Sequence, residues 1–106
     1  MTDTLRSHTE ALRDLLERQF QAHTGQLTEL TVYSREADHG GYDPDTLRAL
    51  METARQGIAD TATALRRMSE GTYGSCEACG GEIPVARLEI LPSARHCVPC
   101  QQRQRR

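Results

Sequence analysis

The sequence predicts a mainly α-helical protein, made of an antiparallel coiled-coil helical hairpin, a small four-cysteine finger and a short C-terminal helix. Two observations lead to this fold class. Apolar residues recur in two long heptad-like series that are separated by a short polar segment. All four cysteines lie in the last third of the chain, in two Cys-x-x-Cys pairs. We therefore expect residues 1–70 to form the hairpin, with its tip at about residues 37–44, and residues 71–106 to form the finger module.

The first helix is expected within residues 3–36, where spacings of four and three positions alternate with one break between Leu16 and Phe20. Gly25 lies inside this segment and weakens a helix by about 1 kcal/mol relative to alanine. An isolated histidine on an apolar seam is usually a tolerated core-edge residue, so we assign His23 no ligand role. The seam consists of Leu5, Thr9, Leu12, Leu16, Phe20, His23, Leu27 and Leu30.

The second helix is expected over residues 45–70, which carry an uninterrupted heptad pattern with a single polar member. Asp43 suits the N-cap position, Pro44 suits the first helical turn, and Asp45 complements the positive helix end. Gly71 follows the last apolar residue and suits the helix end. The seam consists of Leu47, Met51, Ala54, Ile58, Thr61, Leu65 and Met68.

Residues 38–42, Asp-His-Gly-Gly-Tyr, separate the two seams and predict a reversal of the chain. Consecutive glycines permit the backbone angles that a tight turn needs. The two helices then pair within one chain, which predicts a monomer. A parallel dimer formed through either seam is the alternative, and the Gly-Gly pair favours the intramolecular hairpin.

The cysteine spacing indicates one structural zinc ion. Cys76 and Cys79, followed after 17 residues by Cys97 and Cys100, place two thiolates on each of two tight turns, as in a tetrahedral zinc finger. Four thiolates leave no coordination position for water, so catalysis by the metal is not expected. His96 adjoins the second pair and is expected to be a bystander.

Two other uses of the cysteines are less favoured. Disulfides need an oxidising compartment, and the chain shows no apolar N-terminal signal segment. A redox dithiol in the second pair would need a βαβ context, which the sequence does not predict. The apolar residues around the cysteines are expected to form a small core whose folding depends on zinc. They are Ile83, Val85, Leu88, Ile90 and Leu91.

Composition argues against several function classes. No apolar run approaches the roughly 20 residues of a membrane span, and we expect a cytoplasmic protein with no membrane partner. The net charge is −2, and the basic C-terminal end lacks interleaved aromatic residues, so direct sequence-specific DNA binding is not expected. No nucleophile–base pair or phosphate loop has a recognisable spacing, so an enzyme is not expected.

The junction between the second helix and the finger resembles the DksA/TraR family of zinc-finger proteins. The likeness is carried by Gly71-Thr-Tyr-Gly-Ser-Cys-Glu-Ala-Cys-Gly80, Ile83, Pro84, Arg87-Leu-Glu89, Pro92 and Cys97-Val-Pro-Cys-Gln101. The resemblance implies a non-enzymatic transcription regulator that binds bacterial RNA polymerase, with the hairpin in the secondary channel and the zinc module at its rim. It further implies that the nucleotide ppGpp acts at the polymerase interface. The competing interpretation is a zinc-stapled coiled-coil adaptor or dimerisation protein with a different protein partner.

The expected hairpin tip is acidic, but it lacks the family's tip motif, Asp-x-x-Asp-x-Ala. It carries four carboxylates at other spacings, together with two added glycines. Asp43 and Asp45 already have capping roles, so Glu36 and Asp38 are the stronger candidates for partner binding. By the resemblance, basic residues of the finger module are candidate contacts with the polymerase rim. They are Arg87, Arg103, Arg105 and Arg106.

Overall fold

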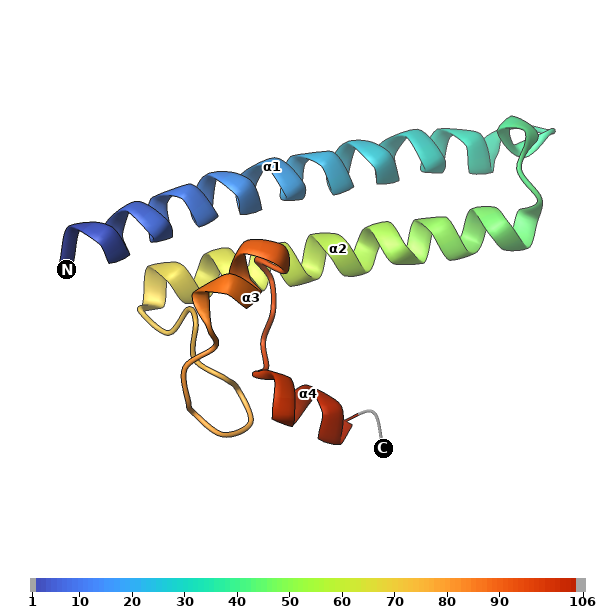
Figure 1. The fold of residues 1–106 in the computed structure, drawn as a ribbon. Coiled ribbons are helices and arrows are strands. Elements are labelled where there is room, and N and C mark those ends of the chain that lie inside the picture. Colours follow the sequence, from blue (N-terminus) through green and yellow to red (C-terminus); the bar gives the residue numbers. More distant parts are fainter. Residues whose placement is uncertain (1, 105–106) are drawn as a thin grey trace.

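The computed structural model describes residues 2–104, with side chains from His8 onward (Figure 1). Its elements are α1 (Thr2–Arg35), the 3-10 turn η1 (His39–Gly41), α2 (Pro44–Glu70), α3 (Val85–Ile90) and α4 (Val98–Gln104). The molecule measures 56 × 34 × 21 Å along its principal axes. Figure 1 shows α1 and α2 running antiparallel as a long hairpin, with α3 beside the C-terminal part of α2 and α4 further from the hairpin, on the same side.

The hairpin is held together by the two predicted seams. Leu12, Leu16 and Leu30 of α1 are buried, and Leu16 is completely inaccessible to solvent. On α2, the seam positions Leu47, Ala54 and Thr61 are buried as well. The polar member Thr61 donates its hydroxyl to the carbonyl oxygen of Gly57 one turn earlier, which satisfies it inside the seam. The predicted intramolecular hairpin is therefore confirmed, and the side chain of the seam residue Leu5 lies outside the described ones.

Both ends of α2 are capped as predicted. The Asp43 carboxylate accepts hydrogen bonds from the backbone N–H groups of Asp45 (3.0 Å) and Thr46 (3.2 Å). Pro44 occupies the first turn, and Gly71 ends the helix with a left-handed φ of 81°. The caps satisfy backbone groups that would otherwise lack partners at the helix ends, so this helix begins and stops where the local sequence directs.

The tip reverses the chain through three consecutive residues with positive φ. These are His39 (53°), Gly40 (61°) and Gly41 (87°). A Cβ on Gly40 would lie 2.6 Å from the Tyr33 ring, so this position has room only for glycine. The Tyr33 ring also lies against Tyr42, with ring centroids 6.0 Å apart, and it thereby joins the end of α1 to the start of α2.

Two glycines lie inside the long helices in different surroundings. Gly25 does not interrupt α1, and a Cβ at this position would meet no atom within 4 Å. Gly57 of α2 faces the ring of His23, and a Cβ there would lie 2.7 Å from three of its ring atoms. His23 thus packs against the position in α2 that has no side chain.

The C-terminal module, residues 71–104, packs its core against the base of the hairpin. One buried cluster contains Cys76, Ile83, Leu88 and Cys100 together with Leu12 of α1. An isolated antiparallel bridge joins Ser75 to Glu82 beside it. Partly buried residues complete the cluster: Met68, Tyr73, Ala94 and Cys97.

The expected core of the module was wrong at two positions. Ile90 is 78% exposed and Leu91 is 49% exposed, whereas Ile83 and Leu88 are buried as expected and Val85 is half-buried. The reason is that α3 is only six residues long and buries only Leu88, so its last residue Ile90 and the following Leu91 face solvent. Among residues 2–104, no helix combines the length and apolarity that crossing a lipid bilayer requires.

Candidate metal centre

The structure brings the four predicted cysteine ligands together. Cys76 and Cys79 lie on the turn that follows α2, Cys97 directly precedes α4, and Cys100 lies within that helix. Their four sulfur atoms all lie within 4.8 Å of one another, and the Cys79 and Cys97 sulfurs are 3.8 Å apart. Sulfurs on a zinc tetrahedron with bonds of about 2.3 Å are separated by roughly 3.8 Å. The cluster is therefore suited to one zinc ion.

Backbone hydrogen bonds shape the first cysteine turn. The N–H of Gly80 donates to the carbonyl oxygen of Cys76 (2.9 Å), and the N–H of Gly81 points to the sulfur of Cys79 (3.4 Å). Gly80 has a φ of 75°, which other residues rarely adopt. The N–H of Cys76 donates in turn to the carbonyl oxygen of Gly81 at 2.7 Å. The turn thus directs both sulfurs to one side and supplies an N–H donor to one of them.

The thiols are electrostatically unequal. Backbone hydrogen bonds, chiefly from Cys97, lower the pKa of the Cys76 thiol to about 6. The pKa of Cys100 is raised to about 12, first by hydrogen bonding to the Cys97 side chain and then by burial. Crowding of four sulfurs opposes the removal of all four protons, because like charges then lie within a few ångströms. A divalent cation supplies the opposing charge, so zinc binding at this site is coupled to proton release.

A second group of residues ties the two cysteine pairs together, and sequence reasoning missed it. Glu77, within the first pair, accepts a hydrogen bond from Nε of Arg95 at 3.0 Å, and a terminal nitrogen of the same guanidinium lies 2.9 Å from the same carboxylate oxygen. Its own N–H donates to the carbonyl oxygen of Arg95 at 2.9 Å. The hydrogen bond from Arg95 holds the pKa of the Glu77 carboxyl below its usual range. Opposite charges beside the two pairs were the available signal, but their pairing depends on the folded loop.

Tyr73 fastens the start of the module to the loop after α3. Its hydroxyl donates to the carbonyl oxygen of Pro92 at 2.7 Å. Burial raises the pKa of Tyr73 to about 12, because its ionised form would lose solvation in the module core. This hydrogen bond joins the two ends of the loop region around α3. The sequence had indicated Tyr73 only as part of the family motif.

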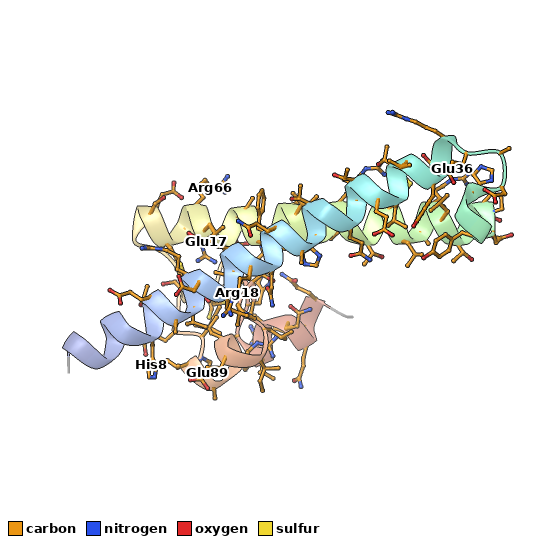
Figure 2. The ribbon with its side chains drawn as sticks, turned by 90° about the horizontal axis from the view of Figure 1, so that it is seen from above. His8, Glu17, Arg18, Glu36, Arg66 and Glu89 are labelled. Atoms are coloured by element: carbon orange, nitrogen blue, oxygen red, sulfur yellow. The ribbon has the colours of Figure 1, made fainter. Side chains whose placement is uncertain are left out.

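The four acidic candidates lie around the tip, at the other end of α2 from the C-terminal module that carries the cysteines, and Figure 2 labels Glu36 there. Asp38 was expected to lack a capping role, and this was wrong: its carboxylate accepts from the N–H of Gly40 at 3.2 Å and caps η1. Asp43 caps α2, and Asp45 pairs with Arg48 at 3.6 Å. Glu36 is exposed and caps no helix within the described part of the chain.

The basic candidates are dispersed. Arg87 is half-buried and donates from Nε to the carbonyl oxygen of His96 at 3.2 Å, which fastens α3 to the loop before the second cysteine pair. Arg103 is exposed in the last turn of α4, while Arg105 and Arg106 lie outside the described residues. The His96 ring lies 3.0 Å from the Gln104 amide, and the candidate ligand cluster found in residues 2–104 contains only cysteines.

Comparisons with known proteins agree with this arrangement. The model of the prokaryotic dksA/traR C4-type zinc finger matches residues 71–106. General stress protein 16O of Bacillus subtilis is 36% identical over 89 residues, which are 80% of this chain and 55% of the relative. The RNA polymerase-binding transcription factor DksA of Caulobacter vibrioides is 39% identical over 72 residues, 66% of this chain and 51% of the relative.

The likeness extends to the hairpin. The structure of transcription factor DksA2 from Pseudomonas aeruginosa superimposes with a TM-score of 0.74 at 30% identity and covers 93% of this chain and 84% of that one. The chain spans about half the length of the two curated relatives described above. The likeness to DksA2 covers the hairpin and the cysteine module together, and the family model covers the module. This chain therefore belongs to the DksA/TraR family of C4-type zinc-finger proteins.

Proposed function

We propose that this protein is a non-enzymatic transcription regulator that binds bacterial RNA polymerase. In this proposal the hairpin enters the secondary channel and the zinc module rests at the channel rim. The observation that carries the proposal is the pairing of a long two-helix hairpin with a four-cysteine module at its base. The same combination aligns with the DksA2 transcription factor, and the Caulobacter relative is named for binding RNA polymerase.

The dimensions of the hairpin support such insertion. The 27 residues of α2 correspond to about 40 Å of helix at 1.5 Å per residue, so the tip is well separated from the module. The apolar seams are used within the chain, since Leu16, Leu47 and Ala54 are buried in the hairpin. A coiled-coil adaptor would instead need a seam available to another chain, so the monomeric hairpin is the better supported alternative.

The tip is proposed to act through Glu36 first. Asp38 and Asp43 use their carboxylates to cap η1 and α2, and Asp45 lies in an ion pair with Arg48. These three then act mainly by keeping the tip in one conformation, and they add negative charge around it. Glu36 alone of the four candidates has neither role, and it presents its charge on the outside of the turn.

The rim contacts are proposed to come from the module. Arg103 is exposed at the end of α4, with Arg105 and Arg106 following in the sequence. Arg87 contributes a guanidinium whose Nε is engaged with His96 while the side chain remains half-exposed. We include ppGpp as a ligand at the same interface, and the proposal places the protein in the cytoplasm, where the polymerase works.

The test is binding of zinc-loaded protein to purified bacterial RNA polymerase core, with a known secondary-channel protein as competitor. Competitive binding is expected, and binding that the competitor leaves unchanged would contradict channel insertion. Glu36→Ala should reduce the effect on transcription in a reconstituted assay while leaving binding within about threefold. Glu17→Ala is the matched control, because Glu17 is exposed on α1 and lies away from the tip (Figure 2).

A further inference from the structure

Arg67 occupies an unusual position for an arginine. It lies in the last turn of α2 with only 9% of its surface exposed, and it is the one charged residue among the buried ones in the described chain. Burial of a guanidinium is costly unless its donors find partners. The neighbouring Arg66 shows the usual alternative, because its side chain is exposed and pairs with Glu70 at 3.6 Å.

The main chain and side chain of Arg67 both hold the segment that leads to the first cysteine. Its carbonyl oxygen accepts from the N–H groups of Thr72 (2.9 Å) and Tyr73 (3.2 Å). Its guanidinium donates to the carbonyl oxygens of Thr72 (2.9 Å) and Ser75. Ser75 directly precedes Cys76, so one side chain reaches from the end of the hairpin to the edge of the metal cluster.

The same guanidinium also begins a chain of charges across the cluster. Its second terminal nitrogen lies 3.8 Å from the carboxylate of Glu77, whose other oxygen pairs with Arg95 at 2.9 Å. Glu77 lies between the first two cysteines, and Arg95 lies two residues before Cys97. The two ion pairs, Arg67 with Glu77 and Glu77 with Arg95, therefore link the hairpin to the first cysteine pair and the first pair to the second.

We propose that Arg67 is a positioning residue that couples closure of the zinc site to the direction of the hairpin. Zinc joins the two cysteine pairs, the pairs hold Glu77 and the Ser75 carbonyl, and Arg67 locks α2 onto both. In this proposal the metal fixes the angle between hairpin and module through this side chain, in addition to the apolar packing of Leu12 and Met68 against the module. The inference rests on the zinc site and on these contacts, and it is independent of the polymerase proposal.

The experiment measures orientation and metal affinity in the full-length, zinc-loaded protein. Residual dipolar couplings of backbone amides report whether the hairpin and the module share one alignment tensor. Zinc affinity is measured by competition with a chromophoric chelator. The variants are Arg67→Met, which keeps the apolar stem, and Arg67→Lys, which keeps the charge but cannot reach two carbonyl oxygens and a carboxylate together. Arg66→Met is the matched control, and Figure 2 shows Arg66 on the edge of α2 away from α3 and α4.

One shared tensor is expected for the wild type and for Arg66→Met, and two distinct tensors for Arg67→Met. The zinc affinity of Arg67→Met should fall about tenfold or more, as is usual when a residue that orients the metal ligands without binding the metal is removed. A shared tensor in Arg67→Met, with zinc affinity within about twofold of wild type, would overturn the proposal even if thermal stability fell.

Arg67→Lys keeps the proposal testable if the methionine variant does not fold. Two tensors that differ from the single wild-type tensor are expected, because lysine retains the attraction to Glu77 but not the hydrogen bonds to both carbonyl oxygens. If Arg67→Lys matches the wild type in both tensor and zinc affinity, the guanidinium geometry has no positioning role.

Discussion

The two helix-interior glycines provide a sharp test of how the hairpin is packed. Alanine is preferred over glycine inside a helix by about 1 kcal/mol at either site. At Gly25 the new methyl group meets no atom within 4 Å, so the full gain should appear. With about 1 kcal/mol corresponding to roughly 4–8 °C for a domain of this size, Gly25→Ala is expected to melt several degrees higher than wild type.

Gly57→Ala is expected to have the opposite effect. The new Cβ would lie 2.7 Å from three ring atoms of His23, which is about 1 Å inside a normal carbon–carbon contact. Either the imidazole leaves the seam or the helices separate, and overpacking of this kind costs about 1–3 kcal/mol. After the gain in helix propensity is included, the net loss is up to about 2 kcal/mol.

The assay is urea unfolding of the zinc-loaded proteins, followed by circular dichroism at the helix band. Removing the ring should relieve the clash, so Gly57→Ala is expected to be less destabilising by about 1–3 kcal/mol in a His23→Ala background. The packing argument is refuted if Gly57→Ala stabilises the protein as much as Gly25→Ala does. It is refuted equally if the effect of Gly57→Ala is the same with and without the histidine.

Three further outcomes follow from the caps, the tyrosine and the metal site. Asp43→Ala should lower the free energy of unfolding by about 1 kcal/mol in urea, because α2 loses its N-cap, whereas Glu36→Ala should change it by less than about 0.5 kcal/mol; equal losses would contradict the cap assignment. Burial raises the pKa of Tyr73 to about 12, so its stabilising contribution is complete below its unfolded pKa of about 10 and is lost as the pH rises through 12. The free energy of unfolding should fall with pH between about pH 10 and 12, and this fall should be smaller in Tyr73→Phe. If the pH dependence is the same in wild type and Tyr73→Phe, the ring is not buried as described. Cys100→Ser removes one of the four converging sulfurs, and metal analysis of the purified variant should find no near-stoichiometric zinc.

Local patterns were sufficient to predict the long elements and the metal cluster. A heptad pattern specifies a helical face over many turns, which is why Leu16 and Leu47 were identified as core from the sequence. Cysteine pairs at zinc-finger spacing likewise carry their chemistry in four residues, and all four sulfurs converge. In both cases the signal is either repeated many times or tied to a very selective ligand.

Features that depend on short elements or distant partners could not be predicted in this way. The apolar residues Ile90 and Leu91 resembled core, but their burial depends on how a six-residue helix is rotated on the cluster. Asp38 caps η1 only because the following residues adopt positive φ. The burial of Arg67 could not be predicted, because it depends on the chain folding back over the end of α2.

The placement of Leu12 also affects how the molecule unfolds. This residue of the first helix lies in one apolar cluster with Leu88 and with the sulfur-bearing Cys100, nearly the full length of the chain away. Forming that cluster closes a very long loop, an entropic cost that is recovered only when the metal-site residues and the helix meet. Heating should therefore give a single cooperative transition, and a chelator that strips the zinc should lower the melting temperature of the long helices as well.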